Sequence, residues 1–160
     1  MSNRLILAAI LSSIILGCDE NRIYETNIPL ENRIWHQDSV LHFDFEISQS
    51  KQLYNLLTNV QYTNEYAYRN LYIRYTLHDS TGAELNSELL ENKLFTDKLG
   101  KPMGSSAIGD IYELQSPLLQ EYQFPNRGKY SISLAQYMRV DSLEELSAIG
   151  IRVEQYKAEE

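Results

Sequence analysis

The chain has 160 residues, of which 43% are hydrophobic and 22% charged, and this composition excludes a low-complexity tail and a protein with many membrane spans. The length indicates one domain, large enough to bury a core without metal ions or disulfides. Fourteen Lys and Arg stand against 22 Asp and Glu, and the net charge of −8 repels phosphate backbones, so the sequence predicts no nucleic acid partner.

The chain starts with an apolar segment, LILAAILSSIIL at residues 5–16, behind Arg4. A membrane span needs about 20 apolar residues, so this segment is too short to span and has the form of a secretory signal. Its end, Ile15-Leu16-Gly17-Cys18, resembles the lipobox of bacterial lipoproteins, in which the chain is cut before the cysteine and the thiol receives an acyl group such as palmitate. This predicts a signal peptide over 1–17 and lipidation at Cys18. The alternative is an ordinary signal peptide followed by a free thiol.

The stretch after the cysteine lacks an apolar period and contains Pro29, which favours a lipidated tether or edge segment over residues 18–33 and a domain over 34–160. Removal of residues 1–17 takes away Arg4 and leaves 13 bases against 22 acids, a net charge of −9. Because that charge opposes docking on an anionic leaflet, lipid is expected to hold the protein at the membrane. Asp19 and Glu20 could act as a sorting signal, but they do not indicate which leaflet.

Apolar and polar residues alternate from Trp35 onward and predict most of the domain as strands. The predicted strands are 41–47, 54–62, 71–77, 84–90, 109–114, 118–124, 129–136 and 149–153. Hairpin turns are predicted at DSTG, 79–82, and PNRG, 125–128. A short helix is predicted over 136–146, where Ser142 and Glu145 are spaced as a capping box. The expected fold is all-β, an antiparallel, jelly-roll-like β-sandwich with at most one short helix.

The histidines, His36, His42 and His78, lack the spacing of a metal motif, and we expect no metal, no other cofactor and no small-molecule substrate. His42, Asp44 and Glu46 share one face of a predicted strand, each about 6.6 Å from the next. Such a row could bind a cation, and its two acids could act as the carboxylate pair of a glycosidase. The simpler interpretation, which we favour, is the solvent-exposed side of an edge strand.

Tyrosine is frequent, with twelve in the chain, and Tyr66, Tyr68 and Tyr72 form a candidate exposed patch. Such a patch could stack on sugar rings or contact a protein, whereas the structural alternative is a half-covered sheet face. A long loop is predicted over 92–110, and loops of that length are often functional. Asp110 at its end is a weaker candidate, expected to tie the loop through backbone amides.

The chain carries a series of short motifs: the lipobox, Trp35, Leu41-x-Phe43-x-Phe45-x-Ile47, Tyr54-Asn55, Asn64-x-Tyr66-x-Tyr68-x-Asn70-Leu71, Gly109-Asp110-Ile111-Tyr112, Phe124-Pro125, Gly128-x-Tyr130, Gln136-x-Met138-Arg139 and Gly150-Ile151-Arg152-Val153-Glu154. Taken together in their order and spacing, these motifs resemble the gliding motility lipoprotein GldH family of Bacteroidota. The segment Lys101 to Ala107 departs from the family pattern, so no role is assigned to that loop specifically.

The resemblance implies a non-enzymatic lipoprotein of the cell envelope, expected at the outer membrane, that is required for gliding. It also implies partners among other gliding and type IX secretion proteins. Two alternatives from the residues themselves remain. One is a surface glycan-binding module that uses the tyrosine patch, and the other is a hydrolase that uses Asp44 and Glu46.

Overall fold

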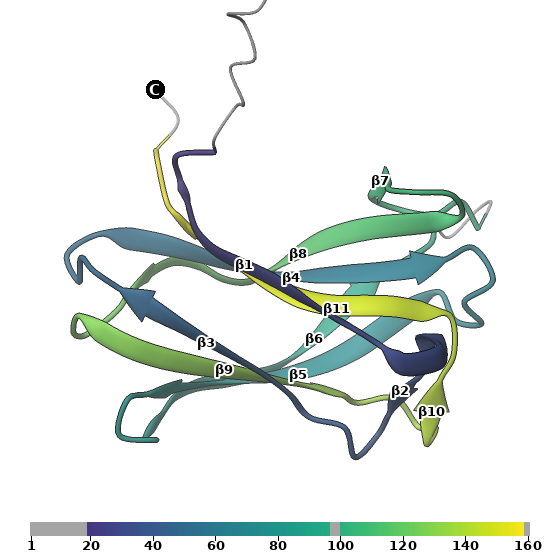
Figure 1. Cartoon of the computed structure of the whole chain (residues 1–160), viewed down its shortest axis with the longest axis horizontal. Coiled ribbons are helices and arrows are strands. Elements are labelled where there is room, and N and C mark those ends of the chain that lie inside the picture. The colour runs from purple at the N-terminus through teal and green to yellow at the C-terminus, as the bar shows by residue number, and fades with distance from the viewer. Residues whose placement is uncertain (1–18, 97–99, 159–160) are drawn as a thin grey trace, which may run out of the picture.

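The computed structural model describes residues 19–96 and 100–158, and within these ranges the chain folds as two antiparallel sheets packed face to face (Figure 1). One sheet has the order β1-β11-β4-β8-β7 and the other β3-β9-β5-β6, and β10 pairs with β2 in a small third sheet. The strands are β1 (Arg22–Pro29), β2 (Trp35–His36), β3 (Leu41–Ile47), β4 (Leu53–Thr63), β5 (Asn70–Asp79), β6 (Glu84–Lys93), β7 (Ser105–Ser106), β8 (Ile111–Gln123), β9 (Gly128–Gln136), β10 (Ser142–Leu143) and β11 (Leu146–Gln155). The predicted antiparallel β-sandwich is confirmed.

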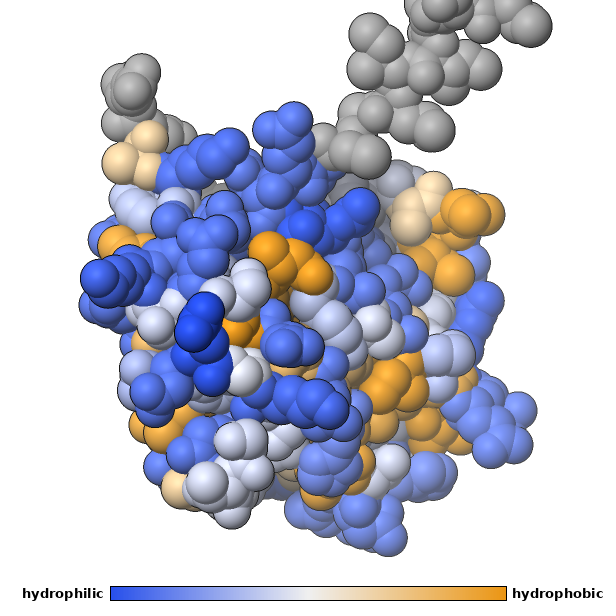
Figure 2. All heavy atoms as spheres, turned by 60° about the vertical axis from the view of Figure 1, so that its left-hand side comes forward, coloured by the Kyte–Doolittle hydropathy of each residue, from blue (hydrophilic) through white to orange (hydrophobic). Residues whose placement is uncertain are grey.

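Because neighbouring strands run in opposite directions, the connections gather at two opposite poles of the sandwich (Figure 1). The terminal pole comprises residues 19–21, 48–52, 80–83, 124–127 and 156–158, and so holds both ends of the described chain. The distal pole comprises 30–40, 64–69, 94–96, 100–110 and 137–145. Figure 2, which turns the side with the terminal pole toward the viewer, shows a mostly hydrophilic surface with separate apolar patches.

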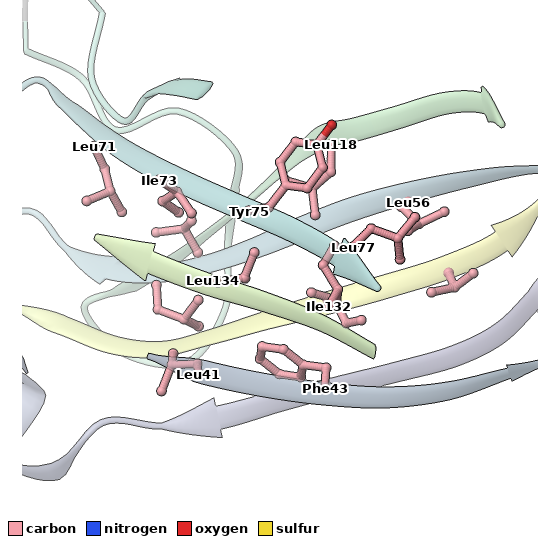
Figure 3. Packing of buried hydrophobic residues seen from close by; sticks show 14 of the residues in the cluster. Leu41, Phe43, Leu56, Leu71, Ile73, Tyr75, Leu77, Leu118, Ile132 and Leu134 are labelled. Atoms are coloured by element: carbon pink, nitrogen blue, oxygen red, sulfur yellow. The ribbon is translucent and has the colours of Figure 1, made fainter. Parts of the chain in front are cut away.

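The core lies between the sheets and follows from the two-residue period of the sequence. In β3 every second side chain is buried, and the same holds along β5 from Leu71 to Leu77. Figure 3 shows these side chains meeting Leu56 of β4 and Leu118 of β8 in the opposite sheet. Alternation therefore fixes which face of each strand is buried and sets the register of the sandwich.

Sheet edges carry charge where they are open. The four-stranded sheet ends at β3 on one side and at β6 on the other. Glu84, Glu88 and Glu91 of β6 are all exposed, as are Asp44 and Glu46 of β3. Charged side chains of this kind are a common feature of unpaired edge strands.

Of the two forms predicted for this stretch, a tether or an edge segment, the structure shows an edge segment, because residues 22–29 form β1 at the edge of the sandwich. β1 pairs with β11 from Arg22 opposite Glu154 to Pro29 opposite Ala148. It is an edge strand with no fully buried residue, so its sequence lacks the alternation seen in β3, β5 and β9. Pro29 closes the strand, a position where a missing N–H is tolerated. The predicted signal peptide and Cys18 lie outside the described residues.

The predicted helix over 136–146 is wrong. The segment is a connection followed by β10, and the helix found within the described residues is a single 3-10 turn, η1 (Glu31–Arg33). The side chain of Gln136 holds this connection, because its amide donates to the Val140 carbonyl at 3.1 Å and accepts from the Met138 N–H at 2.8 Å. Side-chain bonds of this sort replace the helical ladder.

The two strands predicted over 109–114 and 118–124 are one strand, β8. Pro117, which stands between the two predicted segments, lies opposite Leu57 of β4, beyond the point where the short β7 pairs with Tyr112 and Glu113. The outer edge of β8 is therefore open at this position, and a proline is accepted there.

Candidate functional site

The predicted tyrosine patch forms only in part, because Tyr66 is buried. Tyr66 is 5% exposed, its hydroxyl donates to the Asn70 carbonyl at 3.2 Å, and burial raises the pKa of its phenol. The Tyr68 ring packs edge-on against it at 5.7 Å and remains 38% exposed. Tyr66 therefore supports Tyr68 from behind and does not belong to the binding surface itself.

Tyr68 and Tyr72 line an open groove at the distal pole, over the outer face of β5 and β6. Its cavity volume is about 740 Å³, and its lining residues are Gln37, Tyr68, Tyr72, Leu89, Tyr137, Met138, Arg139 and Val140. We call this the distal groove. Tyr137 is 55% exposed, and the guanidinium carbon of Arg74 lies 4.8 Å from the centre of its ring. The groove therefore combines exposed aromatic rings with cationic side chains, a composition typical of binding surfaces.

Four of the residues that line the distal groove, 137–140, were not predicted as part of a site. They were assigned to a helix, in which their side chains would point in several directions. In the structure the Met138 sulfur accepts from the Tyr72 N–H at 3.4 Å, which joins the connection to the start of β5. The signal that could have located them is the alternation of β9, which places Gln136 inside and Tyr137 outside.

Asp110 also lies at the distal pole, but its contacts differ from the expectation. Among the described residues its carboxylate pairs with the Arg33 guanidinium at 3.4 Å and accepts from no backbone amide. Arg33 pairs equally with Glu145 at 3.4 Å, so it links η1 to two other connections. The side chains of Arg33 and Asp110 are 43% and 57% exposed and that of Glu145 is 30% exposed, so these ion pairs contribute little to stability.

The row of polar side chains on β3 is the exposed face of an edge strand. His42, Asp44 and Glu46 point away from the core, opposite Ser133, Ser131 and Lys129 of β9. Within 19–96 and 100–158 no group of three or more His, Cys, Asp or Glu side chains is placed to hold a metal ion.

A charged cluster at the terminal pole was not predicted. Arg152 of β11 contacts three carboxylates: Asp19, Glu154 at 2.7 Å from its Nε, and Glu25 at 3.5 Å from its Nη1. The hydrogen bond from Arg152 lowers the pKa of Asp19. Burial opposes ionisation of Glu25, but hydrogen bonds from Arg22 and Asn59 prevail, so its pKa is lowered too. We call these four charged residues the Arg152 cluster.

Arg152→Gln is expected to lower the free energy of unfolding at pH 7 by roughly 1 kcal/mol, through the partly buried pairs with Glu25 and Glu154. Carboxylates with a lowered folded-state pKa contribute stability above their unfolded pKa of about 4 and lose it as the pH falls through the folded value. The difference between wild type and variant should therefore be full at pH 7 and shrink below about pH 4. Urea titrations across this range measure it, and a pH-independent difference would contradict the assignment.

A β-sandwich whose first strand follows directly on a lipobox-like sequence has the build of an envelope lipoprotein domain. No helix among the described residues is long and apolar enough to cross a membrane. The model of the GldH lipoprotein family matches residues 22–153, and the chain belongs to this family, as the sequence motifs predict.

Two relatives are similar over most of their length. The gliding motility lipoprotein GldH homolog of Christiangramia forsetii is 30% identical over 145 residues, which cover 86% of each chain. The gliding motility lipoprotein GldH of Flavobacterium johnsoniae is 30% identical over 161 aligned residues, which cover 96% of each chain. Membership of a lipoprotein family implies a lipid anchor in the cell envelope.

Proposed function

We propose that this chain is a non-catalytic scaffold or assembly component of the gliding machinery, acylated at Cys18 and associated with type IX secretion at the outer membrane. The observation that carries the proposal is the family match, which extends over nearly all of the folded domain and includes relatives described as gliding motility lipoproteins. The apolar segment and lipobox-like sequence before Cys18 supply the anchor.

The arrangement of the domain supports this role. The chain enters at the terminal pole, and the distal groove lies at the other pole. A protein segment that binds in the groove would meet Tyr68, Tyr72 and Tyr137 as rigid apolar contacts, with Arg74 and Arg139 beside them. Tyrosine and arginine supply much of the binding energy in protein interfaces. The groove is therefore the surface that we assign to another gliding or secretion protein.

Crosslinking in cells tests the assignment. In a deletion strain, the wild-type chain should restore gliding and crosslink to an identified gliding or type IX secretion protein. Tyr137→Ala combined with Tyr68→Ala should reduce the crosslinked partner by about tenfold, the effect of losing about 1.4 kcal/mol of binding free energy. Gliding and export of type IX cargo are scored separately in the same strains, since loss of export would indicate a role in assembly and lost movement alone a role in the motor.

Ile108→Ala is the matched control, because Ile108 is 85% exposed at the same pole but outside the groove, and it should leave both crosslinking and gliding unchanged. A double tyrosine variant that crosslinks like wild type would exclude the groove. Saturable binding of a polysaccharide that the same variant abolishes, without any protein crosslink, would instead support the glycan-binding alternative.

A further inference from the structure

The chain is fixed to the sandwich immediately after Cys18. Asp19 pairs with Arg152, and the Asn21 carbonyl accepts from the Gln155 N–H at 2.8 Å. The Asp19 carboxylate and carbonyl also accept from the N–H groups of Asn21 and Arg22, both at 3.2 Å. These contacts leave no free linker between position 18 and β1.

This geometry limits how far the domain can lie from a bilayer. Consecutive Cα atoms are about 3.8 Å apart, so an acylated Cys18 is one peptide unit from a residue that is bonded to the domain. Acyl chains on Cys18 enter the hydrocarbon, which holds this peptide unit at the headgroups. The terminal pole must then lie against the membrane surface.

The terminal pole is less acidic than the distal pole. Its five segments carry three bases, Lys51, Arg127 and Lys157, and two acids, Asp19 and Glu20, and the rest of the Arg152 cluster adds one base and two acids. Glu159 and Glu160, which follow in the sequence, lie outside the described residues. The described residues of the distal pole carry seven acids and four bases, in addition to His36. An anionic leaflet would therefore repel the distal pole more strongly than the terminal pole.

Apolar side chains at the terminal pole and beside it are also suited to a lipid interface. Ile23, at the start of β1, is 38% exposed although it is a large aliphatic residue. Tyr156, near the end of the described chain, is partly exposed, and its N–H donates to the Leu53 carbonyl at 2.9 Å. Tyrosine is enriched at membrane interfaces because its ring is apolar and its hydroxyl polar.

We propose that the terminal pole binds phospholipid headgroups directly, so that the sandwich stands in a fixed orientation on the bilayer and the distal groove faces away from it. This inference rests on the proposed acylation of Cys18. In this arrangement the Arg152 cluster connects the anchored end of the chain rigidly to the domain, where a flexible tether would let the domain tilt freely. The occupant of the terminal pole is a lipid surface, and a partner protein is restricted to the distal pole.

Energy transfer to lipid tests the orientation. The full lipidated chain is placed in phosphatidylcholine vesicles that contain about one-fifth phosphatidylglycerol and a lipid-bound acceptor dye. Donor dyes are attached to Ser48→Cys at the terminal pole or Glu65→Cys at the distal pole, both exposed positions outside the strands. An acylated Cys18 leaves the introduced cysteine as the reactive thiol, since the chain has one cysteine. Because β4, 11 residues long, separates the sites by about 36 Å, transfer at Ser48→Cys should exceed that at Glu65→Cys by about twofold or more.

A linker variant is the control. Insertion of about twelve Gly and Ser residues between Cys18 and Asp19 gives a flexible reach of about 20 Å and should bring the ratio of the two efficiencies close to one. Equal efficiencies without the linker, in protein that floats with the vesicles, would overturn the fixed orientation and leave the lipid anchor standing. Protein that does not float and carries dye on Cys18 would overturn the anchor, and with it this inference.

Discussion

Replacing Phe124 with alanine is expected to lower the free energy of unfolding by about 3–5 kcal/mol. Phe124 is 1% exposed, and its ring centre lies 4.6 Å from Tyr130 and 5.0 Å from Tyr122. Tyr54 and Phe45 complete its surroundings at 5.5 and 5.9 Å. These rings come from both sheets, so the cavity would open at the point where the two sheets meet and could not close without moving a strand.

Urea denaturation followed by fluorescence measures this loss, because Trp35 is the single tryptophan and is fully buried. Phe124→Leu keeps an apolar side chain and should cost less than the alanine variant, near 1.5 kcal/mol. Ile108→Ala, at an exposed position, should change stability by no more than about 0.5 kcal/mol. A loss below about 1 kcal/mol in Phe124→Ala would show that the aromatic cluster is not packed as described.

Gly150→Ala is expected to destabilise the protein by about 3 kcal/mol, because Asn27 of the neighbouring strand β1 lies directly beside this glycine. A Cβ added at Gly150 would come 1.8 Å from the Asn27 side-chain oxygen and 2.5 Å from the Thr26 carbonyl oxygen. The Asn27 oxygen in turn accepts from the Asn59 amide at 3.2 Å, so it cannot move away without losing a hydrogen bond. The clash would push β1 away from β11 or break the hydrogen bond between Asn59 and Asn27.

A double-mutant cycle separates the clash with the Asn27 side chain from the clash with the Thr26 carbonyl. Asn27→Ala removes the nearer contact but leaves the Thr26 carbonyl, so Asn27→Ala with Gly150→Ala should recover part of the loss and not all of it. Ala135→Val adds methyl groups at a partly exposed position of β9 and should have a small effect. A Gly150→Ala variant as stable as wild type would mean that β1 does not approach β11 as closely as the structure shows.

Strands that bury one face could be predicted from sequence because one rule governs them. β3, β5 and β9 each bury every second residue, and a period of two is visible without knowledge of the partner strand. β1 could not be found this way, since its stability comes from backbone pairing with β11 and not from a buried row of its own. Residues 136–146 were misassigned because the bonds that hold the turn come from one glutamine side chain.

Among the candidate sites, those formed by neighbouring residues could also be predicted, and those formed by residues far apart in the chain could not. Tyr68 and Tyr72 were found from local composition, but the burial of Tyr66 depends on how residues 64–69 turn back on the core. The Arg152 cluster joins residues 19 and 25 to 152 and 154, far apart in the chain. Gly150, Arg152 and Glu154 are part of a family motif, yet their roles appear only when β1 is placed beside β11. Contacts between residues so far apart in the chain leave no periodic pattern in the local sequence.

The acidic edges of the four-stranded sheet become important when many copies of the protein share one membrane surface. Lipoproteins confined to a plane collide more often than the same molecules dispersed in water, and unpaired strands are then prone to join edge to edge. In one antiparallel register of two β6 strands, Glu84 of each molecule would lie opposite Glu91 of the other. Like charges across a strand pair are destabilising, so this edge disfavours such pairing.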